Sequence, residues 1–392
     1  MPVADLTTDM NRPPRMRARA LAIGGLLAMA SSVGIGRFVY TPILPPMSAA
    51  LGLSKSAAGF IASANFLGYL LGALLAAAPF LPGSRRSGLM VALAASALTT
   101  GAMGLASTVP TFVVLRFVGG VASAFGLVFA SALVLDRLAA ARRSELSAVH
   151  FAGVGAGIAA SAAIVAALLA AGSGWRALWL ASGGASLLAL ALVAVLVPDT
   201  VEPPRPSAAT GERRAKLAAL VSAYGLFGFG YVITATFLVT IVRGAPEVQA
   251  LEPVVWIVVG VTAVPSVAVW TWVARRIGEA RAFACACILE AVGVVASVVW
   301  IAPAGIVIAA SLLGGTFMGL TALGLIQGRQ QSRGDPRRAL AIMTAAFGAG
   351  QIVGPAFAGV VYDVTGNFVV PSVAAGAALV VAALLVIGRR PP

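Results

Sequence analysis

Residues 111–135, with the sequence TFVVLRFVGGVASAFGLVFASALVL, carry one charged side chain, Arg116, among apolar and small ones. About 20 such residues in a helix cross the hydrocarbon core of a membrane. Similar runs recur along the 392 residues, of which 60% are hydrophobic and 10% charged. Runs that are apolar on all sides indicate helices, because the strands of a membrane barrel alternate apolar and polar residues. The sequence therefore predicts an all-α membrane protein.

The apolar runs predict twelve transmembrane helices. We expect them at 20–44, 56–81, 88–107, 111–135, 147–171, 175–197, 217–242, 251–273, 281–301, 303–327, 339–362 and 369–388.

The lysines and arginines that give the formal charge of +14 lie almost entirely between the apolar runs, and they do not form a basic domain that could hold nucleic acid. If the N-terminus is cytoplasmic, the outer loops receive only Lys55, Arg176 and Arg243 of the 27 lysines and arginines. Arg37 and Arg116 lie inside spans, and all the others fall on the cytoplasmic side. This asymmetry obeys the positive-inside rule and predicts that both termini are cytoplasmic.

The polar stretch 198–216, PDTVEPPRPSAATGERRAK, divides the chain into two sets of six spans. Its prolines and charges predict a flexible cytoplasmic linker. We therefore expect a disordered N-terminal tail over 1–18, six-helix bundles over 19–197 and 217–388, and a short cytoplasmic tail over 389–392.

The two halves also form a faint repeat. Glycine pairs recur in the same order and at nearly one offset: Gly34 and Gly36 with Gly228 and Gly230, Gly119 and Gly120 with Gly314 and Gly315, and Gly155 and Gly157 with Gly348 and Gly350. Two six-helix bundles with pseudo-two-fold symmetry and a central cavity are the architecture of a rocker-switch transporter.

Several motifs resemble the major facilitator superfamily. GWRALW (174–179) is similar to the opening of the family's helix 6, and RFVGGVASA (116–124) resembles its motif B. GQIVGPAFAG (350–359) is similar to motif C, the antiporter signature, but lies on span 11 instead of span 5. Loop 82–88 lacks the acidic residue of motif A, and Asp136 is the acid that could pair with Arg85 or Arg86.

Four longer stretches resemble the YbfB/YjiJ-type subfamily. This resemblance does not identify the transported substrate. The stretches are GIGRFVYTPILPPM (34–47), ANFLGYLLG (64–72), YGLFGFGYVITATF (224–237) and MTAAFGAGQIVGP (343–355).

Charged residues inside the spans are candidates for function, because placing them in hydrocarbon costs a few kcal/mol. Arg37 and Arg116 should sit at similar depth on helices that line the cavity, and no carboxylate in the first six spans is placed to pair with them. They predict a cationic site for an anionic substrate; alternatively, backbone carbonyls hold Arg116 in a structural or coupling role. Glu290 is the carboxylate nearest mid-span and a candidate proton carrier, with a structural role as the alternative.

Uncharged polar side chains complete the predicted substrate site. Its expected members, besides Arg37 and Arg116, are Tyr40, Asn65, Tyr69, Tyr231 and Gln351. Asn65 and Gln351 lie deep in their spans and must form hydrogen bonds. Glycines and prolines at bends or close contacts predict a second group, for gating and packing: Gly34, Gly36, Pro42, Gly350, Gly354 and Pro355.

The sequence thus predicts a secondary active transporter of the bacterial cytoplasmic membrane. It would move a small organic, anionic solute by alternating access, with proton-coupled export favoured, as a monomer without cofactor or metal. The alternatives are an exporter of lipophilic compounds or several drugs, and a non-transporting membrane sensor or scaffold. A single histidine and no catalytic motif argue against an intramembrane enzyme.

Overall fold

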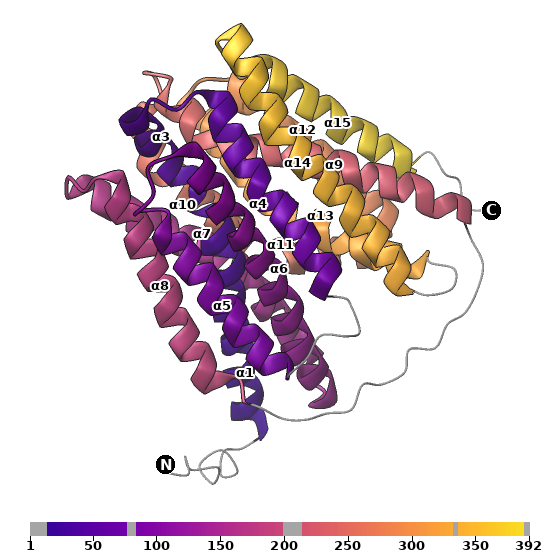
Figure 1. Cartoon of the computed structure of the whole chain (residues 1–392). Helices are drawn as coiled ribbons and strands as arrows, with labels where there is room; N and C mark the ends of the chain where they lie inside the picture. Colours follow the sequence, from indigo (N-terminus) through magenta and orange to yellow (C-terminus); the bar gives the residue numbers. More distant parts are fainter. Residues whose placement is uncertain (1–13, 77–83, 199–213, 332–335, 388–392) are drawn as a thin grey trace, which may run out of the picture.

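The protein is described by a computed structural model that covers residues 14–76, 84–198, 214–331 and 336–387. Every regular element in these ranges is a helix, because a chain in hydrocarbon must satisfy its backbone polar groups within itself. Figure 1 shows the helices as one elongated bundle.

The helices before residue 198 form what we call the first part. They are α1 (Pro14–Met29), a π-helix (Ala30–Ile35), α2 (Gly36–Phe38), α3 (Tyr40–Leu51), α4 (Lys55–Ala76), α5 (Arg85–Ala102), α6 (Val109–Ala140), a 3-10 turn (Ser144–Leu146), α7 (Ser147–Ala170) and α8 (Trp175–Leu196).

The helices after residue 213 form the second part. They are α9 (Arg214–Arg243), a 3-10 turn (Gln249–Leu251), α10 (Glu252–Ala263), α11 (Ser266–Ile277), α12 (Glu279–Val299), α13 (Pro303–Gln330), α14 (Pro336–Thr365) and α15 (Val369–Ile387).

Ten helices in the described ranges are long and apolar enough to span a membrane, and a bent pair makes an eleventh. The pair is α10 and α11, which bend by 44° where the sequence predicts one span over 251–273. The bend lies at Pro265, which has no N–H for the helix ladder. The predicted third span corresponds to α5, whose first turn carries Arg85 and Arg86 and which is not among the ten.

Several segments begin or end at other residues in the structure than the sequence predicts. Helix α1 already begins at Pro14 and α9 at Arg214, so the predicted tail over 1–18 and linker over 198–216 both end in helix. The rest of both segments, 1–13 and 199–213, and the tail 389–392 lie outside the described residues. The first span continues to Leu51, beyond the predicted end at residue 44.

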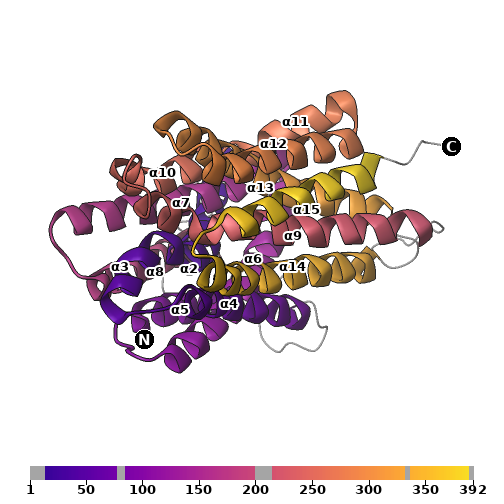
Figure 2. The ribbon, with the colours of Figure 1, turned by 90° about the horizontal axis from the view of Figure 1, so that it is seen from above.

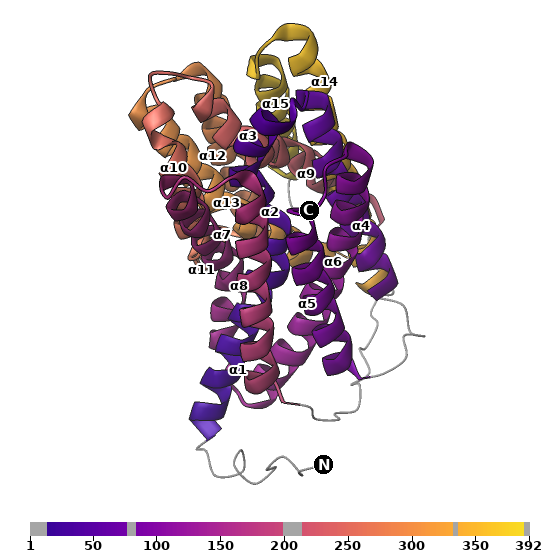
Figure 3. The same ribbon diagram turned by 60° about the vertical axis from the view of Figure 1, so that its left-hand side comes forward.

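Contacts within each part hold the bundle together, and the parts are joined mainly by two long helix pairs, with a smaller contact between α3 and α9. Helix α4 packs on α6, and α5 lies between α6 and α8; in the second part α12 packs on α13 and α15, and α9 on α14 and α15. Across the division, α4 lies along α14 (Figure 2) and α7 along α10 (Figure 3). The two parts therefore meet over long helix faces.

Glycine lets the helices approach until their backbones touch. A methyl group at Gly68 on α4 would overlap the backbone of Phe117 on α6, and one at Gly120 on α6 would overlap Asn65. Between the parts, Gly59 on α4 lies against the Pro355 carbonyl in the same way. Small residues at such contacts allow the dispersion forces that hold helices together in lipid, where the hydrophobic effect contributes little.

Substitution of Gly68 by Val should destabilise the protein, because the branched side chain separates α4 from α6. Overpacking of this kind costs about 1–3 kcal/mol. Thermal unfolding of the detergent-purified chain measures the loss. The control is Gly184→Val on α8, where an added Cβ has no neighbour within 4 Å. Equal melting temperatures for the two variants would contradict the role of the α4–α6 contact.

Candidate functional site

The first span is interrupted in the middle of the bundle. After α1 the chain forms a π-helix and the single turn α2, and Val39 separates α2 from α3. The sequence predicts that Pro42, Pro45 and Pro46 end or bend this span. The helix instead continues through them to Leu51, and the interruption lies before them. Because a proline has no N–H, Pro42 leaves the carbonyl of Phe38, four residues earlier, without its helical donor.

Arg116 on α6 satisfies two carbonyls at this interruption. Its Nη1 donates to the Gly36 carbonyl and its Nη2 to the Arg37 carbonyl, both at 3.0 Å. The guanidinium also lies 5.0 Å from the centre of the Tyr40 ring. Its side chain is buried, so no bulk water replaces these bonds. The geometry matches the structural alternative for Arg116, with the planar fork of donors bridging two carbonyls.

Arg37 on α2 points the other way, toward the second part. Its Nη2 donates to Oε1 of Gln351 on α14 at 2.8 Å. Its guanidinium carbon lies 4.1 Å from the ring centre of Tyr69 and 4.7 Å from that of Phe66. Only 6% of the residue is exposed, and its Nε has no hydrogen-bond partner among the described residues. Within those residues, no carboxylate forms an ion pair with Arg37 or Arg116.

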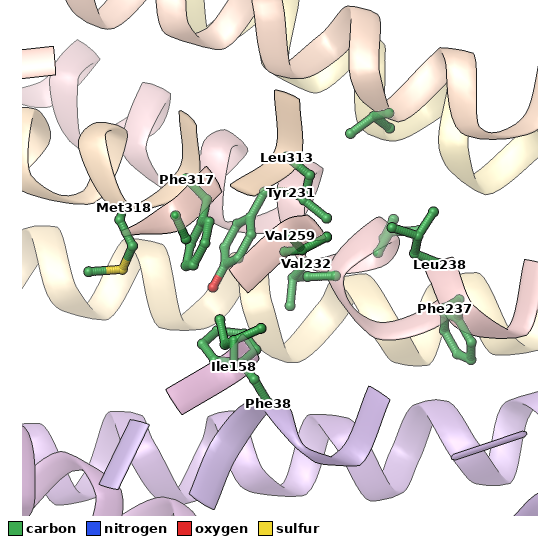
Figure 4. Packing of buried hydrophobic residues seen from close by; sticks show 14 of the residues in the cluster. Phe38, Ile158, Tyr231, Val232, Phe237, Leu238, Val259, Leu313, Phe317 and Met318 are labelled. Atoms are coloured by element: carbon green, nitrogen blue, oxygen red, sulfur yellow. The ribbon is translucent and has the colours of Figure 1, made fainter. Parts of the chain in front are cut away.

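The Gln351 amide links Arg37 to α9. Its Nε2 donates a short hydrogen bond to the hydroxyl of Tyr231, and the whole side chain is buried. Figure 4 shows the Tyr231 ring beside Phe317, with its hydroxyl directed toward the first part, where Phe38 and Ile158 lie. A bridge of three side chains, Arg37–Gln351–Tyr231, therefore joins both parts of the molecule in the apolar core.

The structure brings together all seven residues predicted for the substrate site. Besides the bridge and Arg116, the amide of Asn65 donates to the Arg116 carbonyl at 2.9 Å. Tyr69 stacks over Arg37, while Tyr40 faces Arg116 and donates to the Ala58 carbonyl at 2.8 Å. Asn65 and Tyr40 thus donate to backbone carbonyls of neighbouring helices, and Asn65 has the hydrogen bond that its depth in the span requires.

Sequence reasoning missed Phe66, whose ring forms the second wall of the Arg37 site. It precedes Tyr69 by three residues and so lies on the same face of α4, which is the pattern that could have revealed it. Thr41 and Ser63 were also missed: their hydroxyls donate to carbonyls across the two parts, Thr41 to Ala235 and Ser63 to Ile352, each at 2.6 Å.

A small apolar pocket adjoins the bridge. It is lined by Phe38, Ile158, Tyr231, Ala235, Trp256, Val259, Leu313 and Phe317, and it is too narrow to admit a water molecule. The rings of Phe317 and Phe347 are each parallel to the Tyr231 ring to within 9°, with centroids 5.8 Å from its centroid. The Tyr231 end of the bridge therefore lies among aromatic and aliphatic side chains.

Glu290 is not bonded to this cluster but lies near enough to Tyr231 for an electrostatic interaction. It belongs to α12, which packs on α9, α11, α13 and α15 of the second part. The residue is fully buried, and neither carboxyl oxygen has a hydrogen-bond partner among the described residues. Thr316 on α13 is adjacent, but its hydroxyl donates to the Leu312 carbonyl at 2.6 Å. A buried carboxyl group without a hydrogen-bond partner is energetically costly, so Glu290 stays a candidate for function.

The two parts touch at the end of the bundle that holds residues 52–54 and 366–368, which we call the closed end (top in Figure 1). There the carboxylate of Asp363, on the last turn of α14, accepts hydrogen bonds from the backbone N–H groups of Lys55 and Ser56 at 3.0 and 2.9 Å. Asp363 thereby caps the N-terminus of α4 from the other part, where the helix dipole favours an anion.

Other ionisable groups have structural partners. Arg85 forms the expected ion pair with Asp136, at 3.3 Å and with both side chains more than half exposed. Arg86 instead donates to the carbonyls of Ala194 and Val197 at the end of α8. His150 is buried beside the Ser131 hydroxyl, at 3.1 Å. Groups of three or more His, Cys, Asp or Glu that could hold a metal do not occur in the described ranges.

The predicted gating and packing residues lie at helix contacts. An added methyl group would overlap the backbone of α7 at Gly34, Ser96 at Gly36, the backbone of α9 at Gly350 and the Val232 side chain at Gly354. Pro355 lies inside a continuous α14, and its carbonyl touches Gly59. Whether these residues act in gating stays a prediction.

Comparisons with known proteins agree with this fold. A family model described as "Uncharacterised MFS-type transporter YbfB" matches residues 29–387. A search of curated proteins found no match. Among solved structures, a variant of the nucleoside transporter NupG is 13% identical with a TM-score of 0.73, covering 94% of this chain and 99% of that one. A second NupG structure is 15% identical with a TM-score of 0.69, covering 95% and 98%.

The helical bundle and these matches define a multi-pass membrane transporter of the major facilitator type. Within that class, the chain belongs to the YbfB-type family, whose model spans nearly its whole length. The subfamily resemblance of the sequence is thereby confirmed.

Replacing Arg116 by Met should strongly destabilise the fold, because two buried carbonyls lose their donors, at about 1–3 kcal/mol for each unsatisfied group. Arg116→Lys should recover part of the loss, since an ammonium lacks the planar fork. The control is Arg176→Met: Arg176 also donates to two carbonyls, of Gly104 and Ala106, but is exposed, so water can replace it. The readout is thermal unfolding in detergent, and a similar loss for both Met variants would refute the argument.

Proposed function

We propose that this transporter moves a small organic anion across the bacterial cytoplasmic membrane by alternating access. The observation that carries the proposal is Arg37, a permanent cation buried between the two parts and bonded to a neutral amide instead of a carboxylate. A buried charge is costly unless a counter-charge accompanies it. An anionic substrate would supply that counter-charge at the place where the parts meet.

The proposed architecture is the one predicted from the sequence: twelve spans in two six-helix bundles related by a pseudo-two-fold axis. Its third span would be α5, whose 18 residues measure about 27 Å, close to the thickness of the hydrocarbon core. The positive-inside rule would place both termini in the cytoplasm, and the closed end on the outside. We propose that the transporter works as a monomer.

Alternating access is supported by the kind of contact at the closed end. Asp363 at the closed end, and Ser63 and Thr41 nearer the middle of the bundle, join the parts through hydrogen bonds to backbone atoms, and glycines let the facing helices approach closely. Each such bond contributes only about 0.5–1.5 kcal/mol net. The contact could therefore open at moderate cost while the opposite end closes.

Proton coupling and export are the finer parts of the proposal. Export rests on the likeness of residues 350–359 to the antiporter motif. Coupling rests on Glu290, whose buried carboxyl group has no hydrogen-bond partner among the described residues and would exchange a proton only when the bundle rearranges. An intramembrane carboxyl group is a functional candidate by default.

The competing function is export of a neutral lipophilic compound. The aromatic and aliphatic lining of the pocket beside Tyr231 favours it. In that case Arg37 would serve only to hold α2 against α14.

Substitution of Arg37 by Gln should abolish binding of anions. In a thermal-shift screen of detergent-purified protein against compounds grouped by charge, we expect anions to stabilise the native chain and not the variant. A ligand at 100 times its Kd stabilises by about 2.7 kcal/mol. Arg176→Gln, which changes an exposed arginine, is the control. If neutral compounds stabilise both Arg37 forms equally, the lipophilic-exporter function is favoured instead.

Substitution of Glu290 by Gln should remove proton coupling while substrate binding persists, because an amide keeps the shape of the neutral acid but cannot carry a proton. The measurement is flux into proteoliposomes driven by a pH gradient. Glu252→Gln, at the start of α10 and ion-paired with Arg243 at 3.2 Å, is the matched control. Normal driven flux in the Glu290 variant would exclude this residue from coupling.

A further inference from the structure

We infer that the side-chain amide of Gln351 occupies the place of a substrate carboxylate, and that the substrate is a monocarboxylate with an apolar body. On this inference the arriving carboxylate displaces the amide from Arg37 and Tyr231. It rests on the proposed transport of an organic anion and narrows the substrate class.

The geometry of the bridge supports this assignment. Two groups that can donate hydrogen bonds converge on the ends of one planar amide: the Arg37 guanidinium on its oxygen at 2.8 Å, and the Tyr231 hydroxyl on its nitrogen. A carboxylate has the same planar shape and accepts at both ends. A tyrosine hydroxyl donates as readily as it accepts, so it can serve either group.

The energetics favour the exchange. The amide leaves the charge of Arg37 uncompensated, and Nε of Arg37 has no partner among the described residues. The Arg37–Gln351 hydrogen bond already has an ionised donor, and a carboxylate would add a full opposite charge, whose attraction is stronger in an apolar interior than in water. A carboxylate would therefore bind Arg37 more tightly than Gln351 does, and it would find the site already shaped by the amide.

The number of cations that a ligand can reach and the side chains around them determine the charge of the substrate and the polarity of its body. Arg116 directs both terminal nitrogens to backbone carbonyls, which leaves Arg37 as the cation available to a ligand. One cation matches one negative charge. The rings of Phe38, Phe66 and Tyr69 lie around the Arg37 guanidinium, so a strongly hydrated dianion such as phosphate would lose its water without replacement. An apolar body attached to the carboxylate would instead pack against these rings.

The exchange would also connect binding to movement. Arg37 belongs to α2 in the first part, and Gln351 to α14 in the second, so their hydrogen bond joins the two parts. A carboxylate that takes over Arg37 breaks this bond. Gln351 is thus a positioning residue that sets both the affinity and the link between the parts.

The test uses the full chain in detergent with benzoate, hexanoate, benzamide and phosphate as probes. In thermal-shift titrations, we expect benzoate and hexanoate to raise the melting temperature of the native protein. Benzamide, which has the same ring without the charge, and phosphate should not. Stabilisation by phosphate but not by the carboxylates, lost in Arg37→Gln, would overturn this inference and leave the proposed anion transport standing.

Two variants of Gln351 test the displacement itself. Gln351→Glu supplies the carboxylate internally, so the ligand-free protein should melt higher and its response to benzoate should disappear. Gln351→Met removes the competing amide at similar length, so half-saturation by benzoate should fall by about tenfold, the effect of one hydrogen bond to a charged group.

The control is Gln327→Glu on α13, a second buried glutamine, whose Nε2 donates to the Glu279 carbonyl at 3.1 Å. Its benzoate response should equal that of the native chain. An unchanged benzoate response in Gln351→Glu, or an unchanged half-saturation in Gln351→Met, would overturn the displacement. If none of the anions stabilises the native protein, the proposed function fails together with this inference.

Discussion

The interruption of the first span imposes the constraint on which the centre of this protein depends. Hydrocarbon offers no water to carbonyls where a span departs from the regular α-helix, so these carbonyls need donors from the protein itself. Arg116 meets this need, and one of the two carbonyls that it binds belongs to Arg37. Arg116, which bonds to the carbonyls at the break, therefore also fixes the backbone of Arg37, which faces the second part. Loss of the Arg116 side chain would free the backbone that positions Arg37.

The contacts between the two parts differ along the bundle. In the middle, a charged bridge runs from Arg37 through Gln351 to Tyr231 among aromatic rings. At the closed end, the backbones touch at glycines and Asp363 caps the start of α4 from the other part. Bonds to backbone atoms break and form without changing the shape of a helix. The bridge is specific in its chemistry, and the closed end is held by hydrogen bonds to backbone atoms, a combination that is compatible with the proposed alternating access.

Particular residues show which features of the structure the sequence predicts and which it does not. The apolar runs predict most spans, because a helix in lipid must be apolar along its whole length, but they miss the bend at Pro265 and the helix that continues through Pro45 and Pro46. The rarity of ionisable groups in these runs identifies Arg37 and Arg116. Sequence reasoning left the roles of the two arginines open, since spacing along one helix does not say which carbonyl or amide lies on the next.

Composition and the length of the apolar runs suffice to identify this chain as a helical membrane protein. They also show which side chains need a buried partner, because each charge or amide in an apolar run must find one. The pairs themselves depend on the packing of the helices: Arg116 bonds to carbonyls of the first span in its own part, and Arg37 bonds to Gln351 in the other part. Those pairs join residues as far as 314 positions apart, and such contacts depend on how helices cross, which no local pattern encodes.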